Sequence, residues 1–233
     1  MTDSRVTDSR VTASPGRAID LIAFDVDGTL VEHPDGRVIW QLLNERYHGS
    51  DEIGEARYRE FAAGRLEYQR WVELDVTGWM ERGATRAQLL EEVRKLRRIA
   101  GARQTLAGLQ SRGYKLAVIS GTLDLVLEEH FPSHPFDVVH SNKLHFDADD
   151  RLHAWEATPF DHEGKAHALQ ALADRYGLPL SRCAFVGDNL NDVAATKAAG
   201  FSIALNPKTP EIEAAAHVSI RAAHLGAITE FFP

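Results

Sequence analysis

The stretch LIAFDVDGTLVEH, residues 21–33, ends an apolar run with two aspartates, Asp25 and Asp27, one residue apart and directly before a turn. Two carboxylates this close repel each other, and placing them beside a buried strand adds the cost of removing charge from water. A bound cation or a shared proton would offset both effects. The stretch therefore predicts a core strand that delivers acidic groups to a site.

Further apolar runs of strand length follow this one, and amphipathic helical segments separate most of them. The predicted strands cover residues 19–24, 115–119, 136–139, 183–186 and 201–205. The predicted helices cover residues 103–112, 122–131, 163–176 and 190–199. Near-continuous apolar strands that alternate with helices indicate a parallel sheet covered on both faces. The predicted fold class is therefore α/β, with a doubly wound parallel sheet.

Two segments interrupt the alternation of strands and helices. Residues 142–157 alternate apolar and polar side chains and predict an antiparallel hairpin that turns near Ala148 to Asp150. Residues 34–100 show helical periodicity without a convincing strand, which predicts an inserted helical cap with Gly101 near its exit. The predicted division is a tail at 1–17, a core at 18–33 and 101–233, and a helical cap at 34–100.

Composition and charge exclude several classes of protein. The formal net charge of the 233 residues is −8, which argues against a nucleic-acid surface because such a surface needs a basic face. No apolar run approaches the length of a membrane span, and the polar repeat TDSRV near the start predicts a disordered tail instead of a signal peptide. The one cysteine, Cys183, lies in an apolar run and predicts a buried thiol without disulfide. We expect a soluble cytoplasmic protein that is either a monomer or a homodimer.

Polar residues follow three of the predicted strands, at the strand ends where open parallel sheets bind ligands. These residues are Asp25 and Asp27 after the first strand, Ser120, Gly121 and Thr122 after the second, and Asp188, Asn191 and Asp192 after the run CAFVG. We expect them to meet on one rim of the sheet. Three carboxylates without a Cys or His pattern suit a hard cation such as Mg²⁺.

Lys165 completes this set of residues. It lies in the first turn of a helix that should begin near Asp161 or His162, where a cation opposes the helix dipole unless an anion sits in front of it. Carboxylates with a metal, a hydroxyl beside glycine amides and a lysine predict a site for a phosphoryl group.

Each of these motifs also has a purely structural explanation. Asp-Gly after a strand is often a turn, Ser-Gly often starts a helix, and Asp188 or Asn189 can cap the helix that follows. A single lysine such as Lys165 is more often solvated. The joint occurrence of all four motifs at the same end of successive elements favours a functional site over these explanations.

The motifs DVDGT at 25–29, Ser120 after a strand, Lys165 and GDNLND at 187–192 resemble, in this order, those of the haloacid dehalogenase-like (HAD) hydrolase superfamily. The similarity covers about residues 19–31 and 101–230 and implies a Rossmann-type core. The helical insert between the first two motifs resembles the phosphoserine-phosphatase-like branch. The segment at 63–79 is also similar to a cap segment of that branch.

The resemblance implies a Mg²⁺-dependent phosphatase that acts on a small phosphorylated metabolite. Asp25 would be the nucleophile that takes the phosphoryl group, and Asp27 the general acid and base. The metal would be held by Asp25, the backbone carbonyl of Asp27 and Asp188, with Asp192 in support. The residues that would bind phosphate or substrate are Thr29, Ser120, Gly121, Lys165 and Asn191, with Trp71 and Asp75 from the cap.

The chain departs from phosphoserine phosphatases where, by resemblance, a glutamate and an arginine hold the serine. Ungapped alignment of the motifs puts Pro34 and Asp75 at these places, with Glu32 as an alternative for the glutamate. Asp75 falls on an aromatic helical stripe, where it either faces the substrate or pairs with Arg59 or Arg70. We expect phosphoserine to be a poor substrate. The alternatives that stay open are a phosphoserine phosphatase proper and a receiver-like module that is phosphorylated once and signals or binds.

Overall fold

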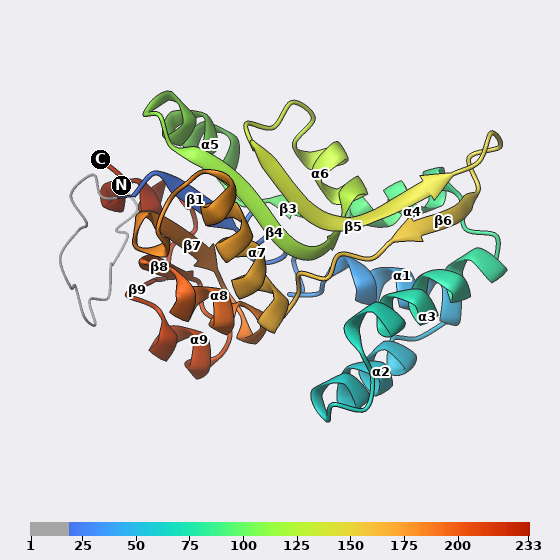
Figure 1. Cartoon of the computed structure of the whole chain (residues 1–233). Helices are drawn as coiled ribbons and strands as arrows, with labels where there is room; N and C mark the ends of the chain where they lie inside the picture. Colours follow the sequence, from blue (N-terminus) through green and yellow to red (C-terminus); the bar gives the residue numbers. More distant parts are fainter. Residues whose placement is uncertain (1–18) are drawn as a thin grey trace.

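The computed structural model describes residues 19–233, and its main element is one mostly parallel sheet (Figure 1). The strands follow one another in space as β6 (Leu152–Glu156), β5 (Val138–Phe146), β4 (Lys115–Leu123), β1 (Leu21–Phe24), β7 (Cys183–Gly187), β8 (Phe201–Leu205) and β9 (Val218–Ile220). All neighbours pair in parallel except β5 and β6. The predicted doubly wound α/β sheet is confirmed, and the disordered tail predicted for residues 1–17 lies outside the described residues.

Alternate residues of β1 point to opposite faces of the sheet, and both faces are covered. Ile22 and Phe24 belong to a buried cluster with side chains of α5 (Ala102–Ser111) and the C-terminal 3₁₀ segment η3 (Leu225–Phe231). Leu21 and Ala23 belong to a second cluster with side chains of α7 (Glu163–Arg175) and α8 (Val193–Ala198). A strand buried on both faces needs apolar residues at every position, which is why the run LIAF is continuous.

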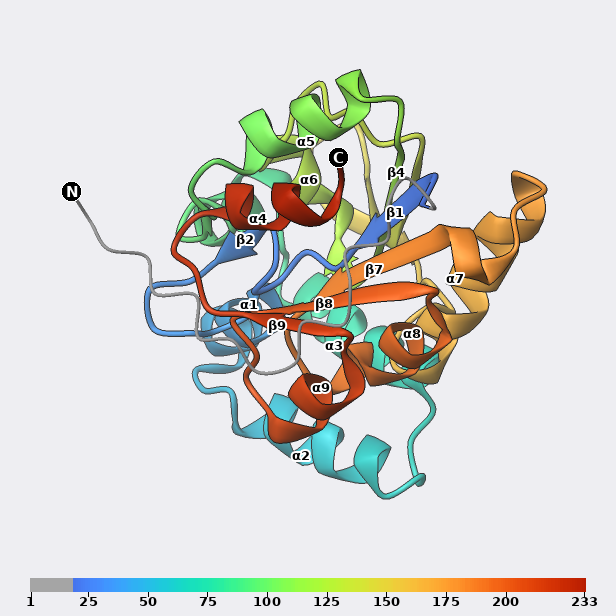
Figure 2. The same ribbon diagram turned by 90° about the vertical axis from the view of Figure 1, so that its left-hand side faces the viewer.

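The remaining elements of the α/β part are short. They are α6 (Asp124–His130), η1 (Leu180–Arg182), η2 (Leu190–Asp192) and α9 (Pro210–Ala215). Figure 2 shows α8 and α9 beside β8 and β9, away from α5 and α6. Cys183 is fully buried and free, as predicted. Among residues 19–233, no helix has the length and apolar character to cross a bilayer.

The predicted hairpin is confirmed, but its first arm is longer than predicted. β5 and β6 pair in antiparallel fashion, with Leu144 opposite Trp155, and Asp147 and Arg151 close the turn by a backbone hydrogen bond of 2.9 Å. The separate strand predicted at 136–139 is wrong, because β5 runs without a break from its pairing with β4 into the hairpin. The polar residues His140 to Asn142 in its middle hid this continuity.

Four helices lie between the first two core strands, as the sequence predicted for residues 34–100. They are α1 (Ile39–His48), α2 (Glu52–Ala62), α3 (Tyr68–Glu81) and α4 (Arg86–Val93). Figure 1 shows α1, α2 and α3 grouped to one side of α7, α8 and α9. The insert also contains β3 (Arg97–Arg98), which pairs with β2 (Val31–Glu32), so the prediction that it has no strand is wrong. A strand of two residues is too short to show an alternating pattern.

Asp124, the first residue of α6, offers a test of buried charge. Its Oδ1 accepts hydrogen bonds from the amides of Leu125 (2.9 Å) and Leu144 (3.3 Å). Burial, with the nearby Glu128 carboxylate, raises the pKa of Asp124 to about 6. A carboxyl whose pKa is raised on folding stabilises the fold when protonated, and that contribution is lost as the pH rises through about 6.

We therefore expect Asp124→Asn, which keeps the acceptor oxygen and removes the charge, to raise the Tm at pH 8 by a few degrees. The gain should shrink between pH 8 and pH 5, because the wild-type carboxyl becomes neutral over that range. Thermal melts of both proteins at several pH values measure this. A Tm difference that does not change with pH would contradict the assignment.

Candidate active site

The carboxyl ends of β1, β4 and β7 meet at one rim of the sheet, as predicted, because these three strands are parallel neighbours. The backbone amide of Asp25 donates to the carbonyl of Val186 at 2.9 Å, which fixes the end of β1 beside the end of β7. Strand pairing therefore brings together Asp25, Ser120 and Asp188, which are far apart in the sequence.

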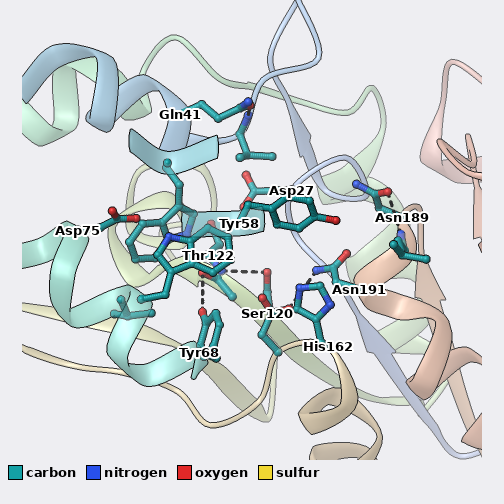
Figure 3. Close-up of a pocket in the computed structure, with 18 of the residues that line it drawn as sticks. Asp27, Gln41, Tyr58, Tyr68, Asp75, Ser120, Thr122, His162, Asn189 and Asn191 are labelled. Atoms are coloured by element: carbon teal, nitrogen blue, oxygen red, sulfur yellow. Dashed lines mark hydrogen bonds between the residues drawn. The ribbon is translucent and has the colours of Figure 1, made fainter. Parts of the chain in front are cut away.

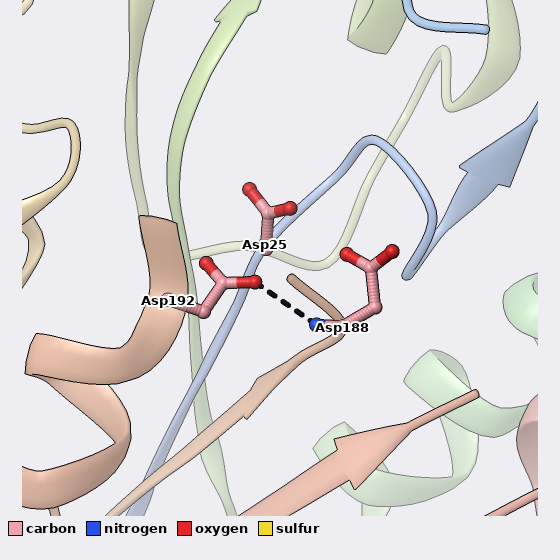
Figure 4. A group of neighbouring side chains, drawn as sticks. All are labelled: Asp25, Asp188 and Asp192. Carbon is pink, nitrogen blue, oxygen red and sulfur yellow. Dashed lines mark hydrogen bonds between the residues drawn. The ribbon is translucent and has the colours of Figure 1, made fainter. Parts of the chain in front are cut away.

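Three buried carboxylates form a cluster at this rim (Figure 4). Asp25, Asp188 and Asp192 each offer an oxygen, and these oxygens lie within 4.8 Å of one another. Burial and the charge of Asp192 raise the pKa of Asp188 to about 8, and burial and the charge of Asp25 raise the pKa of Asp192 to about 6. A cluster of this kind could hold a metal ion.

Lys165 lies against two of these carboxylates and is fully buried. Its Nζ donates to Asp192 Oδ1 at 2.6 Å and to Asp25 Oδ1 at 2.8 Å. Burial alone would lower the pKa of Lys165, but the charges of Asp192 and Asp25 outweigh it and raise the pKa well above its ordinary value. Because α7 begins at Glu163, directly after His162, Lys165 lies in its first turn, as predicted.

The side chain of Asp27 faces the cavity beside Asp25. Burial and the charge of Asp25 raise its pKa to about 6, and its Oδ1 has no hydrogen-bond partner among residues 19–233. The next residue, Gly28, has a φ of 90°, and a Cβ there would lie 2.0 Å from Asp188 Oδ2. Glycine is therefore required here by both the backbone conformation and the approach of Asp188.

Other predicted residues support this cluster. Thr29 is fully buried and its hydroxyl donates to Asp188 Oδ1 at 3.4 Å, so it lies behind that carboxylate. Asp192 Oδ2 accepts from the amide of Asp188 at 2.9 Å. Asn189 caps the short η2, and the side-chain amide of Asn191 donates to Asp161 Oδ1 at 3.0 Å on the cavity wall.

Lys208 is a functional candidate that the sequence reasoning missed. Its Nζ lies 2.8 Å from Asp188 Oδ2, and its backbone amide donates to the carbonyl of Asp188 at 2.8 Å. Lys208 follows β8, so the rule that located Asp25 and Asp188 at strand ends would have found it as well.

Ser120 and Gly121 lie inside β4, not in a loop that starts a helix. The pairing of β4 with β5 shifts register between Ile119 and Leu123, and α6 begins only at Asp124. The helix start predicted at residue 122 is therefore wrong, because the bulged strand continues past Thr122. The bulge lets Ser120, Gly121 and Thr122 all line the cavity.

A cavity of about 560 Å³ joins this rim to the inserted helices (Figure 3). Its wall on the insert side includes four aromatic residues, Trp40, Tyr58, Tyr68 and Trp71, together with three acidic ones. The rings of Tyr58 and Trp71 lie 6.0 Å apart between centroids, within the range of favourable aromatic pairs. Trp71, predicted from the sequence to contact substrate, therefore faces the cavity, whereas neither Pro34 nor Glu32 lines it.

Asp75 also lines the cavity, but its ion-pair partner differs from the prediction. Asp75 is fully buried and forms an ion pair with Arg57 of α2. Burial raises the pKa of Asp75 although Arg57 opposes the shift. The predicted partners are engaged elsewhere, since Arg59 donates to a backbone carbonyl of its own helix and Arg70 pairs with Glu73. Helical spacing along α3 could not show which residue of α2 would face it.

Comparison with known proteins agrees with this geometry. The model of the family described as haloacid dehalogenase-like hydrolase matches residues 19–200. The phosphoserine phosphatase SerB2 of Mycobacterium tuberculosis is 32% identical over 213 residues, which are 89% of this chain and 49% of that protein. The phosphoserine phosphatase of Idiomarina loihiensis is 30% identical over 206 residues, which are 88% of this chain and 90% of that protein.

Solved structures show the same arrangement of chain. A phospho-aspartyl intermediate analogue of phosphoserine phosphatase superposes with a TM-score of 0.73 and 25% identity, over 92% of this chain and 99% of that one. The chain belongs to the haloacid dehalogenase-like hydrolases. Within them it belongs to the phosphoserine-phosphatase-like branch, although it spans only about half the length of the first two curated relatives it matches.

The Arg57–Asp75 pair gives a prediction about stability. Arg57→Ala should lower the free energy of unfolding by about 3 kcal/mol or more, because it leaves a fully buried carboxylate without its cation. In a chain of this size that corresponds to a loss in Tm of roughly 6 to 12 °C. Arg57→Met combined with Asp75→Leu should recover most of it.

Arg70→Ala is the matched control, since it breaks an exposed ion pair with Glu73 three residues away on the same helix. Its effect should stay below about 1 kcal/mol. Thermal melts of the wild type, of the two single variants and of the double variant measure these differences in stability. Equal losses for Arg57→Ala and Arg70→Ala would show that the buried pair has no special role.

Proposed function

We propose that the protein is a Mg²⁺-dependent phosphomonoester hydrolase that works through an aspartyl phosphate on Asp25 and acts on a small phosphorylated metabolite. The main support is that Asp25, the first aspartate of DVDGT, borders the cavity within a buried carboxylate cluster, with Lys165 Nζ 2.8 Å from its Oδ1. Membership of the hydrolase family and the phosphoserine phosphatases among the relatives support the same class.

The residues of the rim account for two successive displacements. The carboxylate of Asp25 attacks phosphorus, and the bond to the leaving oxygen breaks while that oxygen takes a proton from Asp27. With a pKa of about 6, Asp27 keeps a minor protonated fraction near neutral pH, larger than that of an aspartate with an ordinary pKa. Asp27 then removes a proton from the water that attacks the aspartyl phosphate, which releases inorganic phosphate and restores Asp25. Ser120, the Gly121 amide and Lys165 hold phosphoryl oxygens.

The donor set fits Mg²⁺. Asp25, Asp188 and the backbone carbonyl of Asp27 would hold the ion, with Asp192 in support through its hydrogen bond to the Asp188 amide. Burial, with the charges of Asp192 and Asp25, raises the pKa of Asp188 to about 8 although Lys208 opposes the shift. Oxygen donors without sulfur or imidazole are those that Mg²⁺ prefers. When bound, the ion supplies positive charge that reduces the repulsion between the anionic nucleophile and the anionic phosphate.

Hydrolysis of p-nitrophenyl phosphate tests the proposed function. The purified protein with Mg²⁺ should turn over many equivalents of this ester, and excess EDTA should stop the reaction until Mg²⁺ is restored. A receiver-like module, the alternative from another class, would be phosphorylated once and stop. Full activity in EDTA would contradict the metal assignment. Absence of turnover would contradict the proposal that the protein is a phosphomonoester hydrolase.

Asp25→Asn keeps the shape of the nucleophile and removes its charge. We expect kcat/KM to fall by at least about a thousandfold while the Tm changes little, because no attacking carboxylate remains. Asp27→Asn should instead retain slow phosphorylation by esters with good leaving groups. Residual turnover by Asp25→Asn near the wild-type rate, in a protein free of contaminating phosphatase, would reject Asp25 as the nucleophile.

The insert side of the cavity supports a substrate other than phosphoserine. Asp75 stands where an arginine is expected for the serine carboxylate, and its partner Arg57 does not line the cavity. Asp51 and Glu55 add further carboxylates to this wall, and Arg59 is its one arginine among the described residues. We propose that the preferred ester presents hydroxyls, an amine or an apolar body to Tyr58, Tyr68 and Trp71. The net charge of −8 also supports a small metabolite over nucleic acid, and we propose a cytoplasmic location.

Phosphoserine should therefore have a lower kcat/KM than phosphoethanolamine and p-nitrophenyl phosphate, because its carboxylate enters an acidic wall. A panel of phosphorylated metabolites, assayed with Mg²⁺, measures this order. If phosphoserine is the best substrate of the panel, the chain is a phosphoserine phosphatase proper and the proposed role of Asp75 is wrong.

A further inference from the structure

The backbone carbonyl of Gly121 accepts hydrogen bonds from three side chains. Asn142 Nδ2 lies 2.7 Å from this oxygen, Trp40 Nε1 lies 2.9 Å from it, and the hydroxyl of Tyr68 lies 3.5 Å from it. The three donors come from β5, α1 and α3. A carbonyl oxygen has two lone pairs, so this one is fully used.

These hydrogen bonds fix the orientation of the Gly121–Thr122 peptide. A planar trans peptide points its N–H away from its C=O, so a carbonyl held toward the inserted helices directs the Thr122 amide toward the rim. That amide donates to Ser120 Oγ at 3.2 Å. The Ser120 oxygen thus accepts from the chain, and its own hydrogen is left to be donated to a group in the cavity.

We infer that Trp40 is a positioning residue, which acts through the Gly121–Thr122 peptide to aim the hydroxyl of Ser120 at the phosphoryl group. The inference rests on the proposed function. It also gives the inserted helices a role in phosphate binding, because Trp40 and Tyr68 belong to the insert whereas Ser120 belongs to the sheet. Trp40 belongs to no sequence motif, and it lies 80 residues before Ser120 in the chain.

Trp40 is the most informative of the three donors to change. Asn142 also accepts from the amide of Thr158 at 2.8 Å, and Tyr68 also accepts from Asn142, so changes there break several hydrogen bonds. The one hydrogen bond of Trp40's indole N–H is that to Gly121, and its ring packs on Trp79 with centroids 5.2 Å apart. Trp40→Phe therefore removes the donor and keeps an aromatic ring.

The test is a double-mutant cycle of Trp40→Phe with Ser120→Ala, measured as kcat/KM for p-nitrophenyl phosphate and as Kd for inorganic phosphate. In the otherwise wild-type protein, Trp40→Phe should lower kcat/KM and raise the Kd, each about three- to tenfold, which is the usual effect of one hydrogen bond. It should have no further effect in the Ser120→Ala background, because its action passes through Ser120. Trp155→Phe, the same substitution on β6 outside the cavity, is the control for stability and should leave both quantities unchanged.

Equal losses in both backgrounds, or no loss in either, would overturn the inference. A similar loss in Trp155→Phe would overturn it as well, because the effect would then follow from general destabilisation. If the wild-type protein binds phosphate without hydrolysing the ester and the cycle still shows coupling in Kd, the proposed function fails and the role of Trp40 stands. If it neither hydrolyses nor binds, both fail.

Discussion

The buried ammonium group of Lys165, held between Asp25 and Asp192, is the interaction on which the rest of the rim depends. Without it, the three buried carboxylates of Asp25, Asp188 and Asp192 would face one another with less positive charge beside them. The lysine reaches them only because α7 packs on one face of the sheet and begins next to the strand ends. Packing of the sheet and the charge balance of the site therefore have a common origin.

At the same rim, the negative charge of Asp188 is balanced by groups of its own. Thr29 and Lys208 contact its two oxygens, and Gly28 leaves the space that this approach needs. Lys165 and Lys208 thus contact different carboxylates of the cluster. Lys165 comes from α7, and Lys208 comes from the loop after β8.

Much of this arrangement could be predicted from the sequence because it follows from strand periodicity. The runs LIAF, KLAVI and CAFVG are continuous, and the residues directly after each of them indicated the rim. The features that were missed depend on contacts between elements. Arg57 of α2 pairs with Asp75 of α3, and Trp40 of α1 donates a hydrogen bond to the Gly121 carbonyl of β4. Their spacing in the sequence has no period, and only the packed structure brings them together.

The pairing of β2 with β3 means that the chain leaves the sheet and returns to it through neighbouring residues, since Glu32 lies opposite Arg97. The insert between them also touches the sheet at the start of β6, where the amide of Leu152 donates to the carbonyl of Ala84 at 2.8 Å. A replacement insert without groups equivalent to Trp40 and Tyr68 would leave the Gly121 carbonyl with the donor from Asn142 of β5 alone.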